Sequence, residues 1–99
     1  MNYRVRYTRK ASEDLLRLYR FLLDQDSAAA ERALVAIRQG AELLSRFPFT
    51  CRKADADNPF LRELVISFGV AGYVMLFEVE DAQQVTILAI RHQREDDYH

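Results

Sequence analysis

Residues 61–92 read LRELVISFGVAGYVMLFEVEDAQQVTILAIRH, and apolar residues recur at every second position through most of this stretch. A period of two is typical of strands that bury one face. The alternation occurs in three runs, at Leu64, Ile66 and Phe68, then Tyr73, Met75, Phe77 and Val79, and then Val85, Ile87 and Ala89. Residues 69–72 and 81–84 separate the runs and predict short turns. The stretch therefore predicts a three-stranded antiparallel meander.

Two helices are predicted before the meander. In residues 9–25 apolar side chains follow the helical period, and Thr8 offers an N-cap. Asp26 and Ser27 interrupt this pattern, and residues 28–46 are rich in helix formers before Pro48. The second helix has small residues such as Ala33 and Gly40 on its apolar side. We expect these residues to let it approach the first helix closely, as an antiparallel hairpin requires.

The remaining segments complete an α+β fold. Tyr3, Val5 and Tyr7 alternate with two arginines and predict an N-terminal strand. Residues 50–59 have neither period and predict an exposed loop. The fold expected for residues 1–99 is one domain, with an N-terminal strand, an antiparallel helical hairpin and the meander, giving one small sheet covered by two helices.

Composition narrows the classes of function. The chain has no apolar run of membrane-spanning length and no signal-peptide pattern at Met1, so we expect a cytoplasmic protein. The single cysteine, Cys51, excludes an internal disulfide, and we expect a buried or neutral thiol. No phosphate-binding glycine loop or zinc-ligand spacing occurs, which predicts neither a cofactor nor a metal. The net charge is −1, so a strong electrostatic footprint for nucleic acid is not expected.

The last strand continues into a polar tail, and residues 87–98 read ILAIRHQREDDY. This ending resembles the closing strand of the ParE/RelE toxin family, with its His-x-Arg tail and late tyrosine. Thr8 with Ala11 and Asp14-Leu15 also resembles the family, as does the run LREL at residues 61–64. The order of strand, helical hairpin, loop and meander extends the resemblance over essentially the whole chain.

The resemblance implies a toxin of a type II toxin–antitoxin module. A cognate antitoxin, ParD-like and DNA-binding, would neutralise it in a hetero-oligomer by contacting the helical hairpin and the sheet. A partner could bury apolar surface of the first helix and place acidic groups near the basic start of the chain. The residues expected to bind the antitoxin are Arg4, Arg6, Arg9, Lys10, Leu16, Tyr19 and Leu23.

The family implies two possible mechanisms. RelE-like toxins cut messenger RNA on the ribosome, whereas ParE-like toxins poison DNA gyrase and catalyse nothing themselves. RNA cleavage needs a group to take the 2′-hydroxyl proton, cations for the phosphorane and an acid for the leaving oxygen. Arg62 lies near the start of the meander, and Arg91 and His92 lie at its end, so we expect these ends on one side of the sheet. The candidate catalytic residues are Arg62, Arg91, His92, Arg94 and Tyr98.

The charge of the chain favours the gyrase mechanism. A RelE-like mRNA endonuclease is the alternative, and another small binding or structural protein is the third possibility. A ribosome-directed nuclease would benefit from a positive electrostatic field. The predicted loop at residues 50–59, however, contains only one lysine, Lys53. Residues 95–97 are acidic and would repel a phosphate backbone. The residues expected to bind the target are then Arg91, His92, Arg94 and Tyr98.

Structural roles compete with these functional ones. Arg62 could pair with Glu13 or Asp14 on the first helix, and His92 could be an exposed hydrogen-bonded side chain at a strand end. Arg94 could belong to a solvated charge run, and Tyr98 could anchor the tail by packing its ring on the sheet.

Overall fold

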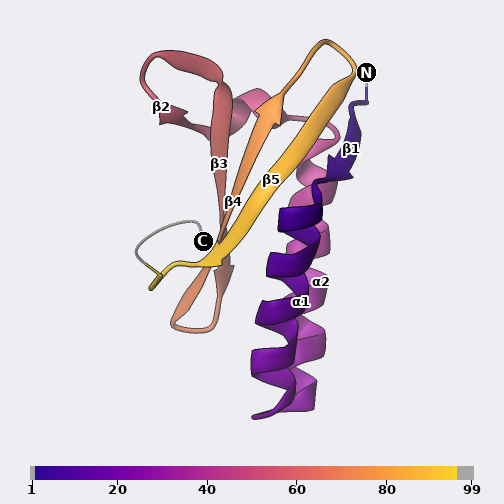
Figure 1. Ribbon diagram of the computed structural model, residues 1–99, viewed down its shortest axis with the longest axis vertical. Coiled ribbons are helices and arrows are strands. Elements are labelled where there is room, and N and C mark those ends of the chain that lie inside the picture. The colour runs from indigo at the N-terminus through magenta and orange to yellow at the C-terminus, as the bar shows by residue number, and fades with distance from the viewer. Residues whose placement is uncertain (1, 96–99) are drawn as a thin grey trace.

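The computed structural model describes residues 2–95 and shows a five-stranded sheet with two helices packed on one of its faces (Figure 1). This arrangement is the predicted α+β fold. No helix within residues 2–95 is both long enough and apolar enough to cross a membrane. The elements are β1 (Arg4–Tyr7), α1 (Arg9–Leu23), α2 (Ser27–Leu44), the 3-10 turn η1 (Pro48–Thr50), β2 (Arg52–Asp55), β3 (Asn58–Phe68), β4 (Ala71–Val79) and β5 (Gln84–His92).

Side-chain caps fix where both helices begin. The Thr8 hydroxyl accepts a hydrogen bond from the backbone N–H of Ala11 at 3.1 Å, which caps α1 as predicted. The Asp26 carboxylate accepts from Ala28 and Ala29 in the same way at the start of α2. Both helices end two residues earlier than predicted, at Leu23 and Leu44. The predicted helical hairpin is confirmed.

Gly40 brings α2 against the sheet. A Cβ at Gly40 would lie 2.8 Å from Cδ1 of Ile66 and 3.1 Å from Cδ2 of Leu64, both on β3. The expectation that this residue serves the approach of α2 to α1 was therefore wrong. Ala30, Ala33 and Ile37 are buried on the same helix and join the core.

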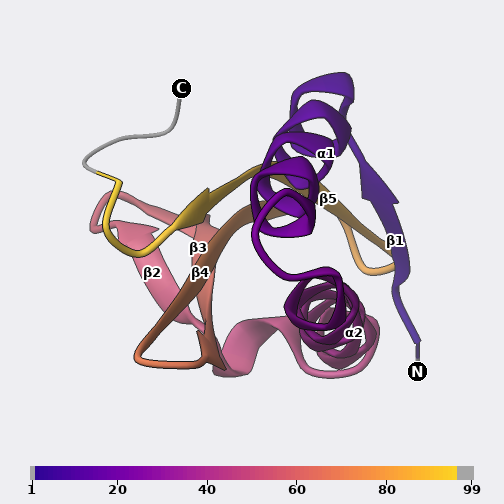
Figure 2. The same ribbon diagram turned by 90° about the horizontal axis from the view of Figure 1, so that it is seen from below.

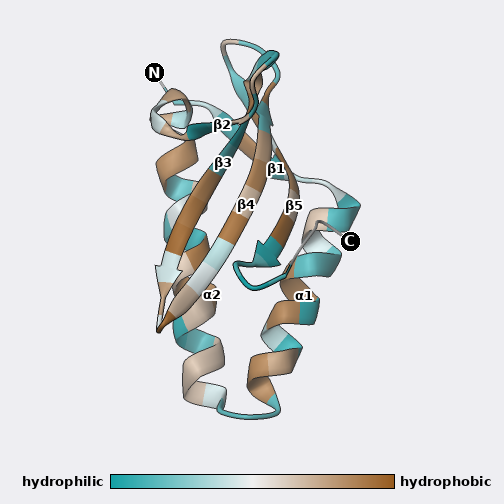
Figure 3. Ribbon diagram, turned by 90° about the vertical axis from the view of Figure 1, so that its left-hand side faces the viewer, coloured by the Kyte–Doolittle hydropathy of each residue, from teal (hydrophilic) through white to brown (hydrophobic). Residues whose placement is uncertain are grey.

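The sheet has the order β1-β5-β4-β3-β2, and the meander of β3, β4 and β5 is antiparallel, as predicted. β1 lies parallel to β5, with Val5 opposite Val85, so the two ends of the chain form adjacent strands. Both helices lie on one side of the curved sheet (Figure 2), behind the strands in the view of Figure 3. The core between these layers includes Phe77, Met75, Ile87, Ile90, Ile37 and Leu44, all of which are fully buried.

The predicted loop at residues 50–59 is wrong over most of its length. It contains β2, which pairs antiparallel with β3 so that Arg52 lies opposite Glu63 and forms an ion pair of 3.1 Å with it. All four residues of β2 are exposed. An edge strand with both faces in solvent buries no apolar side chain, so it has no hydrophobic period to recognise.

A β-bulge in β5 changes which side chains face the helices. Leu76 pairs with Ala89 but Phe77 pairs with Ile87, which leaves Leu88 as the extra residue. The predicted alternation of Val85, Ile87 and Ala89 therefore holds only up to the bulge, and Ile90 is the next residue to enter the core. The start of α1 binds the bulge, because the Thr8 hydroxyl donates to the Leu88 carbonyl at 3.1 Å.

Candidate target-binding site

An apolar groove of about 740 Å³ lies between α1, the turn that joins β3 to β4, and the end of β5. Its walls contain Leu18, Phe68 and Tyr73. Phe21 is 64 % exposed and Val70 is 96 % exposed at its border. Contiguous exposed apolar surface, as these side chains form with the groove walls, marks surfaces where proteins bind partners. The remaining lining residues are Arg17, Leu22, Gly69, Ala71, His92, Arg94 and Glu95.

His92 enters the groove because of the bulge. After Leu88 the alternation in β5 shifts by one residue, so His92 pairs with Tyr73 and shares the helix side of the sheet with it. The two rings meet edge to face with centroids 5.7 Å apart. Nδ1 of His92 accepts a hydrogen bond from the backbone N–H of Arg94 at 3.1 Å. Two of the predicted target-binding residues, His92 and Arg94, thus line one groove.

Arg91 points to the other face of the sheet, where it holds the tail. Arg91 pairs with Val74, the residue next to Tyr73 on β4, and neighbouring residues of a strand face opposite sides of the sheet. Its Nη1 donates to the carbonyls of His92, Gln93 and Glu95 at 3.3, 3.4 and 3.0 Å. Arg91 is therefore a residue that positions the tail and does not line the groove. Tyr98, the fourth residue expected to bind the target, lies outside the described residues.

An ion pair joins the tail to α1 beside the groove. Nη1 of Arg17 lies 2.6 Å from Oε1 of Glu95, and Oε2 of Glu95 accepts from the backbone N–H of His92 at 3.3 Å. Burial raises the pKa of the Tyr73 hydroxyl above its ordinary value, because the tyrosinate would lose its hydration inside the groove wall. The wall is thus an uncharged aromatic surface at neutral pH, with charged groups at its rim.

The expected meeting of Arg62 with Arg91 and His92 was wrong. β3 and β5 both lie antiparallel to β4, so they run in the same direction and the start of one lies far from the end of the other. Arg62 pairs with Phe77 and His92 pairs with Tyr73, four positions apart along β4. At about 3.3 Å per residue this offset is roughly 13 Å along the strands. Arg91 lies on the opposite face from both.

Arg62 is occupied by a structural role. Its Nε donates to the Pro59 carbonyl at 2.7 Å, and its Nη1 donates to the carbonyls of Phe49 and Cys51 at 3.1 and 2.7 Å. Its guanidinium also lies 5.0 Å from the centroid of the Phe49 ring. These contacts attach η1 and the start of β2 to β3. A structural role for Arg62 is thus confirmed, but its partners are backbone carbonyls and not Glu13 or Asp14.

The basic residues expected to bind the antitoxin divide into two kinds. Arg6 donates to the Thr86 hydroxyl at 3.1 Å and lies 3.5 Å from Glu80, and Lys10 lies 3.0 Å from both carboxylate oxygens of Asp14. Arg4 and Arg9 are exposed and make no side-chain contact of this kind within residues 2–95. The positive charge at the start of the chain is thus smaller than its sequence implies, because carboxylates partly neutralise Arg6 and Lys10.

The predicted apolar contacts on α1 lie away from the groove. Leu16 and Leu23 are each more than a third exposed, and the hydroxyl of Tyr19 donates to Glu31 on α2 at 3.3 Å. Phe21 and Val70 were not predicted as site residues. Phe21 lies off the apolar stripe of its helix, and Val70 is an apolar residue inside a turn, so both positions were detectable as apolar side chains where burial is not expected.

The single cysteine, Cys51, lies between η1 and β2. It is buried, which raises the pKa of its thiol, while a hydrogen bond from Thr50 and the charge of Arg62 partly oppose that shift. The prediction of a buried thiol is confirmed. Across residues 2–95 no three histidine, cysteine or carboxylate side chains cluster closely enough to hold a metal ion.

Comparison with known proteins agrees with this architecture. The family described as ParE toxin of type II toxin-antitoxin system, parDE, matches residues 5–97. Toxin RelE3 of Caulobacter vibrioides is 39% identical over 87 residues, which cover 87% of this chain and 89% of that protein. The solved structure of the chromosomal ParDE TA system from P. aeruginosa has a TM-score of 0.70 at 20% identity, covering 91% of this chain and 95% of that one.

The fold and the matches define the class of protein as a toxin of the ParE/RelE superfamily. The chain belongs to the ParE toxin family of type II toxin–antitoxin systems. A toxin of such a system has an antitoxin as its partner.

Proposed function

We propose that this toxin poisons DNA gyrase in the cytoplasm and catalyses no reaction itself. The observation that carries the proposal is the separation of Arg62 from His92 by roughly 13 Å along the sheet. A nuclease must bring a proton acceptor and phosphate-binding cations to the same bond, and this sheet spreads the candidate groups over both faces. The groove beside His92 is apolar, which suits a protein target better than a phosphate backbone.

A ribosome-dependent mRNA endonuclease is the second candidate. The relative that shares 39% of its residues with this chain over 87 residues bears the name Toxin RelE3. In that case His92 and Arg94, which border one groove, would act on the RNA without help from Arg62. His92 would have to exchange protons with the RNA while the Arg94 backbone N–H occupies its Nδ1.

One preparation of the toxin can be tested against both targets. Purified gyrase and a supercoiling substrate form the first assay, and ribosomes with a defined messenger form the second. We expect accumulation of cleaved DNA in the first assay and an intact messenger in the second. Codon-positioned messenger cleavage with unaffected gyrase would overturn the proposal and assign the toxin to the endonuclease class.

Substitution of Phe21, which lines the groove, tests whether the groove is the contact with gyrase. We expect Phe21→Ser to weaken gyrase inhibition about tenfold, because exposed aromatic anchors contribute strongly to protein interfaces. Val35→Ser is the matched control, since Val35 is a half-exposed apolar residue on α2 that does not line the groove. Equal inhibition by both variants would show that the groove is not the contact with gyrase.

We also propose that the partner is a ParD-like, DNA-binding antitoxin that holds the toxin in a hetero-oligomer. Its toxin-binding segment would cover Leu16, Tyr19 and Leu23 on α1 and reach the exposed cations Arg4 and Arg9. Support comes from the apolar exposure on α1 next to a first strand that still carries free positive charge.

Charge reversal tests the electrostatic part of this proposal. The double variant Arg4→Glu/Arg9→Glu should bind the cognate antitoxin about tenfold more weakly at low salt, as measured by calorimetry. The difference should shrink with added salt because exposed charges are screened. Lys53→Glu on β2 provides a control on an exposed strand at the other edge of the sheet. Unchanged affinity of the double variant at low salt would refute the electrostatic contribution.

A further inference from the structure

The groove beside His92 has a polar border on which the open hydrogen-bonding groups are donors. His92, Arg94, Arg17 and Glu95 form this border next to the apolar walls. Glu95 is the only carboxylate among the described lining residues, and both of its oxygens have partners. Oε1 accepts from Nη1 of Arg17 at 2.6 Å, and Oε2 accepts from the backbone N–H of His92 at 3.3 Å. A ligand in the groove must therefore supply its own acceptor.

His92 provides the first open donor. Its Nδ1 accepts from the backbone N–H of Arg94 at 3.1 Å, so the neutral ring carries its hydrogen on Nε2. Nε2 makes no hydrogen bond within residues 2–95, and it is not sealed from solvent. The edge-to-face contact with Tyr73 holds the ring against the groove wall. A donor that is fixed beside apolar surface orients the acceptor of a ligand.

Arg94 adds positive charge to the same border. This residue is exposed, and its guanidinium pairs with no carboxylate of the described chain. Arg17 is already paired with Glu95 and lies 3.8 Å from Asp14 as well. Arg17 and Glu95 offset each other, so Arg94 leaves the border with an excess of positive charge. Such a border favours a partner that carries negative charge.

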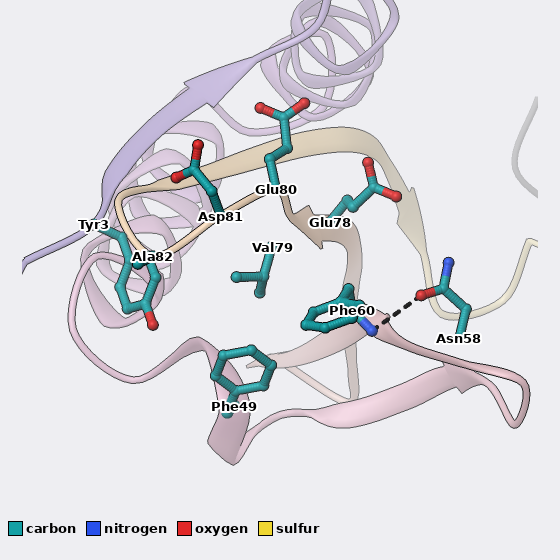
Figure 4. A pocket seen from close by; sticks show the side chains of 9 residues that line it. All are labelled: Tyr3, Phe49, Asn58, Phe60, Glu78, Val79, Glu80, Asp81 and Ala82. Carbon is teal, nitrogen blue, oxygen red and sulfur yellow. Dashed lines mark hydrogen bonds between the residues drawn. The ribbon is translucent and has the colours of Figure 1, made fainter.

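A hollow of about 720 Å³ at the opposite end of the sheet, where β4 leads into β5, lacks this combination. Phe49 and Phe60 form its apolar side, and Glu80 and Asp81 direct their carboxylates away from these rings (Figure 4). No arginine, lysine or histidine of residues 2–95 lines it. This hollow is therefore an internal control, with exposed apolar surface but no cationic donor beside it.

We propose that the groove beside His92 binds a segment of the target in which a carboxylate lies between apolar side chains. The apolar side chains would pack on Phe21 and Val70. The carboxylate would accept from Nε2 of His92 and pair with Arg94. This inference rests on the proposal that the groove contacts the target, and it adds the chemistry of the segment that enters. A cationic segment would be rejected by the charge of Arg94.

Short peptides test the charged and the apolar requirement separately. The probes are acetyl-Leu-Asp-Leu-amide, acetyl-Leu-Asn-Leu-amide and acetyl-Ser-Asp-Ser-amide, titrated into ¹⁵N-labelled toxin and followed by amide chemical shifts. We expect the first peptide to shift the amides of Phe21, Val70 and His92 with a dissociation constant on the order of 1 mM. Each of the other two should bind about fivefold more weakly, since one lacks the charge and the other lacks the apolar side chains.

Two variants assign the preference for the carboxylate to the border. His92→Phe keeps an aromatic ring next to Tyr73 but removes Nε2, and Arg94→Gln removes the charge. In each variant the preference for the aspartate peptide over the asparagine peptide should fall to about twofold. Because this preference is a ratio within one variant, a general loss of stability does not produce it. Arg46→Gln, at an exposed cation outside the groove, is the matched control and should keep the full preference.

The inference is overturned if the aspartate and asparagine peptides bind equally, if Phe60 shifts in place of Phe21, or if no amide shifts at millimolar peptide. Competition with gyrase separates this result from the proposed function. The aspartate peptide at saturating concentration should relieve gyrase inhibition. Peptide binding with the expected preference but without relief would contradict the groove as the gyrase contact, while the chemistry of the groove would stand.

Discussion

Gly72→Ala is expected to prevent stable folding of the toxin. A Cβ at this position would lie 1.9 Å from the carbonyl oxygen of Ile66 and 2.9 Å from its carbonyl carbon. Both atoms belong to the backbone of the paired strand β3, so relief requires the β3–β4 hairpin to move apart. Overpacking that a side chain cannot relieve costs about 3 kcal/mol or more. Circular dichroism and urea unfolding would measure the loss.

Gly69→Ala provides the control at the neighbouring turn. Gly69 has a φ of 63° in the two-residue turn between β3 and β4, and a Cβ there would meet nothing within 4 Å. Its replacement should cost about 1 kcal/mol, the strain of a left-handed residue alone. A Gly72→Ala protein as stable as the Gly69→Ala protein would show that the backbones of β3 and β4 can separate at this point without loss of the fold.

The contrast between these glycines shows what the sequence could and could not predict. Alternating apolar residues predicted β3, β4 and β5 because each buries one face, and the helical period predicted α1 and α2 for the same reason. The turn was placed at residues 69–72, yet Gly72 already belongs to β4. Two glycines close together look alike in a sequence, and only the tertiary contact with Ile66 separates their roles.

The candidate site was predicted less completely than the fold. His92 and Arg94 do line a groove, as their place after the last strand suggested. The bulge at Leu88 decides which face of the sheet His92 occupies. The hydropathy pattern of the sequence does not reveal such an extra residue in a strand. The expected meeting of Arg62 with His92 failed for a different reason. It required the outer strands of a meander to run in opposite directions, whereas they run the same way.

Asp14→Ala is expected to have the second largest effect, because Asp14 joins α1 to β5 from a buried position. Its Oδ2 accepts a hydrogen bond from the backbone N–H of Ile90 at 3.0 Å, and Lys10 lies 3.0 Å from both of its oxygens. Alanine would leave the Ile90 N–H buried without an acceptor and remove the partner of Lys10. We expect a loss of about 2–3 kcal/mol in the free energy of unfolding, measured in urea.

Two further variants separate the contributions to this loss. Asp14→Asn keeps an oxygen for the Ile90 N–H and removes only the charge, and Lys10 is partly exposed and can be hydrated, so the cost should be about 1 kcal/mol. Glu13→Ala removes an exposed carboxylate from the same turn of α1 and should change stability by less than about 0.5 kcal/mol. If Asp14→Ala lowered the stability as little as Glu13→Ala, the hydrogen bond to Ile90 would not be what holds α1 on β5 next to the bulge. Because that bulge turns His92 into the groove, a loosened α1 should also weaken binding of the target.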